Sequence, residues 1–167
     1  MTQGLIYTRK TTSTEATKQL AQTLAPYLQP GDAIILNGDL GSGKTQFVQG
    51  VAAGLGMQSA VTSPTFNILM SYEEGSLPLY HFDWYRLEQE NELEDVSYYD
   101  VIDGPGATFI EWAEKFPSAL PYDYLQVEIS VEESEIRTIK VSSYGERARR
   151  LLVVWAKDSK SRLTRMN

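Results

Sequence analysis

The sequence has no cysteine and only one histidine, His81, among its 167 residues. Without cysteine the chain cannot contain a disulfide framework, a zinc–thiolate centre or a thiol nucleophile. A single imidazole also excludes a metal site built from several histidines. No apolar run approaches the ~18 residues that a membrane span requires, and the N-terminal residues lack the basic-then-apolar order of a signal peptide. We therefore expect a cytoplasmic protein that does not associate with membranes.

The charge of the chain is unevenly distributed. Hydrophobic residues make up 42% and charged residues 22% of the sequence, as in an ordinary globular domain. The net charge is −7, yet residues 147–167 alone carry seven Lys or Arg against one Asp. The acidic body would repel nucleic acid, whereas the basic tail can attract phosphate or an acidic protein surface. The alternative is that the tail is only a solvated chain end.

Hydrophobic periodicity predicts alternating strands and helices. The expected order is strand 5–8, helix 13–28, strand 33–37, helix 44–55, strands 66–72 and 77–83, strand 107–111, a hairpin of 124–131 and 136–143, and helix 145–156. This order indicates an α/β domain with a mostly parallel central sheet, and the late hairpin predicts antiparallel edge strands. We expect one domain over residues 1–156 and a flexible basic tail over 157–167.

The segment GDLGSGKT, from Gly38 to Thr45, matches the pattern G-x-x-x-x-G-K-[ST] between a predicted strand and a predicted helix. Glycines let such a loop aim backbone N–H groups at phosphate oxygens, and the following helix turns its positive end toward them. Lys44 would reach the β- and γ-phosphates, and the Thr45 hydroxyl would bind Mg²⁺. The predicted nucleotide-binding residues here are Asp39, Leu40, Gly41, Ser42, Gly43, Lys44, Thr45 and Gln46.

A second motif, HFDWYRL (residues 81–87), ends an apolar strand with Asp83. A phosphate loop needs a further metal anchor, which a carboxylate at the end of a neighbouring strand can supply. Asp83 is therefore the predicted metal ligand, and the alternative is that it only caps the following turn. His81 should share a strand face with Asp83 and either orient that carboxylate or pack. Arg86 either pairs with the acidic residues 88–103 or touches a phosphate.

Two shorter segments complete the candidate site. In TSPTF (62–66), a threonine in a polar loop can sense the γ-phosphate through Mg²⁺, as switch loops do. In FIEW (109–112), Glu111 ends another apolar strand. If its strand adjoins that of Asp83, Glu111 points at the same crevice and either polarises the attacking water or completes the metal shell. The alternative for Glu111 is an acid at a helix start.

Together these segments resemble one family, the TsaE family, small P-loop ATPases needed for the threonylcarbamoyladenosine modification of tRNA. The matching residues are GDLGSGKT (38–45), SPTF (63–66), HFDWYRL (81–87) and IEW (110–112). The likeness covers about residues 12–145 and gives no support to the basic tail. The first segment is shared by many nucleoside triphosphatases, and the other three are far more specific.

The resemblance implies a P-loop three-layer α/β sandwich that binds ATP and Mg²⁺. It implies that Thr45, Asp83 and Glu111 serve the metal and that Lys44, Thr65, Asp83 and Glu111 are catalytic. It also implies that Trp112, Arg137 and Ser13 close over the nucleotide. Its implied partners are the other proteins of the bacterial threonylcarbamoyl-transferase complex, which the ATPase resets or drives. Contact with tRNA would be indirect or through the basic tail.

Two other functions use the same phosphate loop. A small-molecule kinase needs Arg or Lys side chains to neutralise the transferred phosphoryl group. Between Thr45 and Glu114 the chain has one such residue, Arg86, and residues 88–103 hold seven carboxylates and no Lys or Arg. A nucleotide-binding scaffold without turnover also fits the sequence. Phosphate release with and without acceptors separates all three functions.

Overall fold

The sheet of this protein has parallel strands at its centre. The computed structural model describes residues 4–159 and 163–165, and in these residues eight strands form one sheet in the order β3-β4-β5-β2-β6-β7-β1-β8. Strands β4, β5, β2 and β6 are mutually parallel, and the strands on either side are antiparallel. The bounds are β1 (Leu5–Thr11), β2 (Ala33–Asn37), β3 (Leu69–Tyr72), β4 (Leu79–Asp83), β5 (Ala107–Glu111), β6 (Tyr124–Glu133), β7 (Ile136–Tyr144) and β8 (Leu163–Arg165). The predicted α/β fold with central parallel strands is confirmed.

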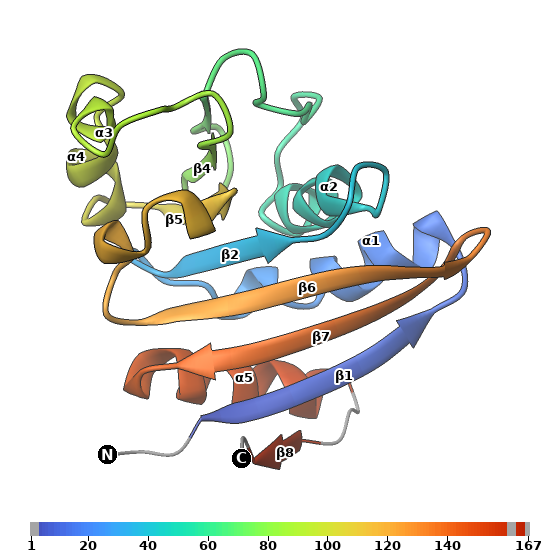
Figure 1. Ribbon diagram of the computed structural model, residues 1–167. Coiled ribbons are helices and arrows are strands. Elements are labelled where there is room, and N and C mark those ends of the chain that lie inside the picture. The colour runs from blue at the N-terminus through green and yellow to red at the C-terminus, as the bar shows by residue number, and fades with distance from the viewer. Residues whose placement is uncertain (1–3, 160–162, 166–167) are drawn as a thin grey trace.

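Helices cover both faces of the sheet (Figure 1). They are α1 (Thr14–Gln22), α2 (Lys44–Gly54), α3 (Glu92–Asp95), α4 (Tyr98–Ile102) and α5 (Glu146–Asp158), with 3-10 turns η1 (Ala25–Tyr27), η2 (Ala113–Lys115) and η3 (Pro117–Ala119). One face packs against α1, α2 and α5, and the other packs against α3 and α4 over β4, β5 and β2. Central strand β2 is therefore buried on both faces, as its continuous apolar run predicts.

Successive side chains of β2 point to opposite faces of the sheet and belong to two separate hydrophobic clusters. Ile34 and Leu36 belong to the larger cluster, with α1, α2 and α5, while Ala33 and Ile35 belong to the smaller one. In the larger cluster Trp155 of α5 stacks on Tyr7 of β1, with ring centroids 5.0 Å apart. This packing fixes β2 between two hydrophobic layers and thereby holds rigidly the loop that leaves its carboxyl end.

Helix α1 is shorter than the sequence predicted. The expected helix 13–28 ends at Gln22 and is followed by the 3-10 turn η1. Pro26 explains the break, because proline has no N–H to donate and its ring clashes with the preceding helical turn. Ser13 is the N-cap of this helix, and its hydroxyl accepts a hydrogen bond from Ala16 N at 3.0 Å.

The predicted strands 66–72 and 77–83 also begin later than expected, at Leu69 and Leu79. Residue Ile68 has a φ of 67°, a left-handed conformation that is incompatible with a strand. Its amide donates to Pro64 O at 2.7 Å, so the preceding residues form a turn instead. The acidic segment 88–103, for which the sequence predicted no element, contains α3 and α4.

The last helix extends beyond residue 156, where the sequence predicted that it ends. Helix α5 continues to Asp158, and Leu163–Arg165 form β8, which pairs antiparallel with β1. Residues 160–162 and 166–167 of the expected tail lie outside the described residues, among them Lys160 and Arg162. In the described part of the chain, no helix has the length and apolarity to cross a membrane.

Candidate active site

The phosphate-loop segment connects β2 directly to α2. Residue Gly43 caps the helix with a φ of 119°, and Gly41 has a φ of 80°, both in the region that favours glycine. A Cβ on Gly38 would lie 2.4 Å from Ser42 Oγ and 2.7 Å from Ile129 O. All three glycines of the segment GDLGSGKT are therefore required by backbone conformation or close packing.

A buried hydroxyl marks the inside of this loop. Ser42 is 1% exposed, and its Oγ has no hydrogen-bond partner among the described residues. A buried polar atom without a partner is costly, and a bound phosphate oxygen can satisfy it. Together with the positive end of α2 and the glycine backbone, this hydroxyl fits a phosphate group.

The two predicted carboxylates meet beside this loop. Asp83 and Glu111 are register partners at the ends of β4 and β5, and Glu111 in turn pairs with Leu36 of β2. Parallel strands present their carboxyl ends at the same edge of a sheet, so the two acids and the phosphate loop lie at one edge. Both acids are buried, with 2% and 5% exposure. The prediction that their strands are neighbours is confirmed.

Glu111 holds two basic groups, one on each carboxylate oxygen. Lys44 Nζ lies 3.2 Å from Oε1, and His81 Nε2 lies 2.7 Å from Oε2. Burial alone would raise the pKa of Glu111, but the His81 hydrogen bond and the nearby His81 and Lys44 charges outweigh it and lower that pKa. The carboxylate is therefore ionised at neutral pH and makes a strong acceptor.

The sequence suggested that His81 either orients Asp83 or packs. The ring is wholly buried, as the packing alternative expects, and its hydrogen bond joins it to Glu111 on the adjacent strand rather than to Asp83. Only the order of strands reveals this pairing, since 30 residues separate the two in the chain.

Asp83 makes two hydrogen bonds, and one of them is the turn cap that was the alternative to its predicted metal role. Its Oδ1 accepts a hydrogen bond from Tyr85 N at 2.8 Å, which caps the turn after β4. Its Oδ2 accepts from Thr65 Oγ1 at 2.9 Å, which ties the polar loop 62–66 to the strand end. Only Oδ1 takes part in the turn cap, so Oδ2 is available for the hydrogen bond with Thr65.

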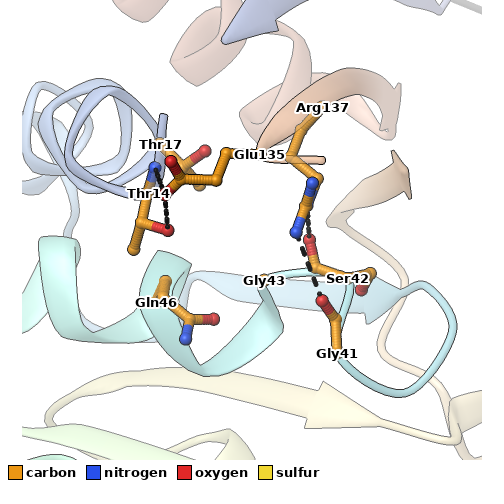
Figure 2. Close-up of a pocket in the computed structure, with 8 residues that line it drawn as sticks. All are labelled: Thr14, Thr17, Gly41, Ser42, Gly43, Gln46, Glu135 and Arg137. Atoms are coloured by element: carbon orange, nitrogen blue, oxygen red, sulfur yellow. Dashed lines mark hydrogen bonds between the residues drawn. The ribbon is translucent and has the colours of Figure 1, made fainter. Parts of the chain in front are cut away.

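Two nucleotide-site residues expected from the resemblance make contacts with the protein itself. The Ser13 hydroxyl caps α1, and Arg137 donates from Nε to Ser42 O at 2.7 Å. Arg137 also borders a cavity of about 40 Å³ (Figure 2). The cavity is lined by Thr14, Thr17, Gly41, Ser42, Gly43, Gln46, Glu135 and Arg137.

The sequence did not single out Glu135, which closes one side of this cavity. Its Oε1 accepts a hydrogen bond from Thr14 Oγ1 at 3.1 Å, which links the β6–β7 turn to the start of α1 (Figure 2). No sequence motif marks this residue, because its position depends on where the hairpin turn meets another element.

Aromatic residues surround the two acids. Trp84 is buried against Tyr98, at a centroid distance of 5.1 Å. Trp112, in contrast, is 40% exposed and lies 4.8 Å from the Tyr85 ring. The Arg86 guanidinium lies 4.6 Å from the centroid of the Phe66 ring, so it contacts this ring rather than the acidic segment that follows it in the chain.

The side-chain oxygens of Thr45 and Asp83 suit a magnesium ion that is also bound by phosphate oxygens. Among the described residues no group of three or more His, Asp or Glu side chains could hold a metal ion. A hydroxyl at Thr45 and a carboxylate at Asp83 are hard oxygen donors of the type that Mg²⁺ uses alongside nucleotide phosphates and water. These residues fit the ion as ligands within a nucleotide complex.

A strand, a glycine-rich loop of this form and a helix, set in a sheet with central parallel strands, define a P-loop α/β domain. Within this class the chain belongs to the TsaE family. The family model described as "Threonylcarbamoyl adenosine biosynthesis protein TsaE" matches residues 11–158. The family expected from the sequence motifs is thereby confirmed.

Curated relatives and a solved structure agree with this assignment. A Bacillus subtilis protein named "tRNA threonylcarbamoyladenosine biosynthesis protein TsaE" is 41% identical over 138 residues, covering 83% of this chain and 86% of the relative. A Synechocystis protein of the same name is 47% identical over 105 residues, covering 61% and 67%. The crystal structure of Bacillus subtilis YdiB superposes with a TM-score of 0.79 at 34% identity, covering 92% of this chain and 96% of that one.

Proposed function

We propose that this protein is a Mg²⁺-dependent ATPase that acts in the cytoplasm to support the threonylcarbamoyladenosine modification of tRNA. The observation that carries the proposal is the meeting of Lys44, Asp83 and Glu111 at one edge of the sheet. The ammonium group of Lys44 thus pairs with Glu111, and the strand that ends in Glu111 adjoins the strand that ends in Asp83. Family membership supports the biological process, and the geometry supports the chemistry.

In this proposal the phosphate loop binds the β- and γ-phosphates through Lys44 and backbone N–H groups. When bound, Mg²⁺ withdraws negative charge from the phosphate oxygens. Thr45 and Asp83 would hold the ion. Thr65, which donates a hydrogen bond to Asp83, would change position when the γ-phosphate is bound.

Glu111 is the proposed group that positions the attacking water. Lys44 and His81 each contact one of its oxygens. When Lys44 turns toward a phosphate, Oε1 is released and can accept a hydrogen bond from water. His81 keeps Oε2 and so holds the carboxylate in place. The alternative role, a ligand that completes the metal shell, uses the same released oxygen.

We further propose that the isolated chain hydrolyses ATP slowly and that partner proteins accelerate it. Phosphoryl transfer to water needs positive charge near the developing transition state, and an arginine supplied by a partner can raise the rate by about 10³–10⁵. Arg86 contacts the Phe66 ring, and Arg137 contacts the outside of the phosphate loop. The expected partners are the other proteins of the threonylcarbamoyl-transferase complex.

The basic tail remains the proposed contact for an anionic partner, either a protein of that complex or tRNA. Lys157 and Arg165, two of its described cations, are both exposed. Their attraction to tRNA should weaken as salt concentration rises. Equal tRNA binding by a Lys157→Gln, Arg165→Gln double variant at low salt would remove these two residues from that role.

The test is steady-state phosphate release by the purified chain, alone and with the purified partner proteins. Synthesis of modified tRNA is followed in the same mixtures, with one arm that omits this chain. We expect slow release alone, faster release with partners, and loss of sustained modification when the chain is omitted. The Lys44→Ala variant serves as the inactive control.

Three other outcomes of this experiment would contradict the proposed function. Transfer of the γ-phosphate to a small acceptor, with no free phosphate, would identify a kinase. ATP binding with no phosphate release in any mixture would identify a nucleotide-binding scaffold. Fast release by the isolated chain, unchanged by partners, would show that the activating charge comes from this chain.

A further inference from the structure

The outer side of the phosphate loop is held by a single guanidinium. Arg137 donates from Nε to Ser42 O at 2.7 Å and from Nη2 to Gly41 O at 3.5 Å. Figure 2 shows the side chain reaching from the β6–β7 hairpin to these two carbonyl groups. The residues are 95 and 96 positions apart, so this contact joins two distant parts of the fold.

The guanidinium of Arg137 is also hydrogen-bonded to the β6–β7 turn, beside its own strand. Its Nη1 donates to Ser134 O at 2.7 Å and to Ile136 O at 3.2 Å. Ser134 has a φ of 50°, so the turn that supplies one of these acceptors adopts a left-handed conformation without glycine. Because the fork binds its own turn and the phosphate loop at once, it acts as a rigid bridge rather than a mobile side chain.

The bond to Ser42 O determines where the next amide points. All peptide bonds of the described residues are trans, and in a trans peptide the C=O and N–H groups point in opposite directions. With Ser42 O turned outward to Arg137, the N–H of Gly43 is turned to the opposite side. Gly43 N has no backbone acceptor among the described residues, whereas Ser42 N bonds Asp39 O at 2.9 Å.

The charge of Arg137 strengthens this effect. Within the described residues none of the ion pairs within 4.0 Å involves Arg137, and its printed acceptors are all carbonyl oxygens. A charged donor on Ser42 O polarises the peptide and makes Gly43 N–H a better donor in turn.

We propose that Arg137 is a positioning residue for phosphate binding, acting through the Ser42–Gly43 peptide and not by contact with the nucleotide. It turns the Gly43 N–H toward the side of the peptide opposite to the guanidinium. This inference rests on the proposed function, since it assumes that the loop binds nucleotide phosphates. It replaces the expectation that Arg137 closes over the nucleotide, because that contact would require the guanidinium to release Ser42 O.

The first measurement uses the chain without any nucleotide. The backbone amide of Gly43 is observed by NMR after selective ¹⁵N-glycine labelling, in the wild type and in Arg137→Met. We expect a shifted Gly43 resonance and faster amide hydrogen exchange in the variant. Lys140→Met, a change three residues further along β7, is the matched control and should leave that resonance in place.

The second measurement separates geometry from charge. Affinities for ATP and for inorganic tripolyphosphate are measured by calorimetry for Arg137→Met and Arg137→Lys. Lysine keeps the charge but cannot donate to both carbonyls through a planar fork. We expect both variants to lose about tenfold in affinity for both ligands, as removal of one charge-assisted hydrogen bond would cause. Arg137→Gln, which keeps one N–H donor, should recover part of the loss.

Two results would overturn the inference. A Gly43 amide that is unchanged in Arg137→Met, together with weaker ATP binding, would indicate direct contact with the nucleotide. A shifted amide with unchanged affinity would show that the amide's direction does not matter for binding. If Arg137→Met does not fold, Arg137→Gln and Arg137→Lys provide the same comparisons. Failure of the wild type to bind ATP would instead refute the proposed function and leave the amide result standing.

Discussion

Lys44 and Glu111 form an ion pair of 3.2 Å that joins the first residue of α2 to the last residue of β5. The second oxygen of Glu111 contacts His81 from β4. Three elements therefore meet in one buried charge cluster beside the phosphate loop. Replacing any of these side chains changes the electrostatic environment of the other two, and this coupling governs several of the expected outcomes.

Lys44→Ala should lower ATP affinity by about 100-fold. The change removes the ammonium that would contact the β- and γ-phosphates, and charged hydrogen bonds of this type contribute about 1.5–3 kcal/mol each. Isothermal titration calorimetry measures the effect. Lys10→Ala, an exposed lysine on β1, is the matched control and should bind ATP like the wild type. Unchanged affinity in Lys44→Ala would disprove the assignment of the phosphate loop.

Asp83→Asn should raise the Mg²⁺ concentration needed for half-maximal ATP hydrolysis by about tenfold, since it removes an anionic metal ligand. The asparagine carbonyl can still accept from Tyr85 N, so the turn after β4 should persist. Thr65→Val, which removes the hydroxyl bonded to Asp83, should have a smaller effect in the same direction. Identical Mg²⁺ dependence in wild type and Asp83→Asn would leave Asp83 with only its capping role.

The contribution of Glu111 to stability should depend on pH. Its pKa is lowered from the ordinary 4.5, so the folded state binds its proton less readily than the unfolded state. The stabilisation is therefore complete above the ordinary pKa and is lost as pH falls through the lower folded value. Urea unfolding of wild type and Glu111→Gln across this range measures the difference, which should shrink toward low pH. A difference that grows on acidification would contradict the charge assignment.

His81→Phe should raise the pKa of Glu111, because it removes the hydrogen bond and the neighbouring charge that favour the carboxylate. His81→Gln keeps an N–H donor on the same strand and should raise that pKa less. Carboxyl ¹³C titration by NMR reports the value directly. If the two variants give the same Glu111 titration as the wild type, the 2.7 Å contact does not control its ionisation.

Arg147→Met should destabilise the fold by about 3 kcal/mol, because it leaves the buried carboxylate of Asp32 without its partner. Arg147 holds both oxygens of Asp32, at 2.9 and 2.8 Å, and Asp32 is 6% exposed. Arg150→Met removes an exposed pair with Glu146, at 3.6 Å, and should cost less than about 1 kcal/mol. Denaturant unfolding monitored by circular dichroism measures both. Equal losses would show that burial does not set the strength of the Asp32 pair.

Short-range patterns in the sequence identified the family and the chemical groups. Glycines with positive φ at positions 41 and 43, a lysine and a hydroxyl after them, and an apolar strand before them define a phosphate loop in any context. The local chemistry of a turn depends on neighbouring residues, so the pattern is readable without tertiary information. Pro26, which shortens one predicted helix, is a local signal that hydrophobic periodicity alone overlooked, whereas the left-handed conformation of Ile68 could not be read from its residue type.

The sequence by itself thus determined the phosphate loop, the strand-ending acids Asp83 and Glu111 and the parallel core. Only the tertiary structure decided that His81 bonds Glu111 rather than Asp83, because that choice depends on β4 and β5 lying side by side. It also decided that Arg137 binds the loop carbonyls across 95 residues of chain. Contacts of this kind arise from the packing of whole elements, and no local pattern of residue types encodes which distant backbone groups a side chain will meet.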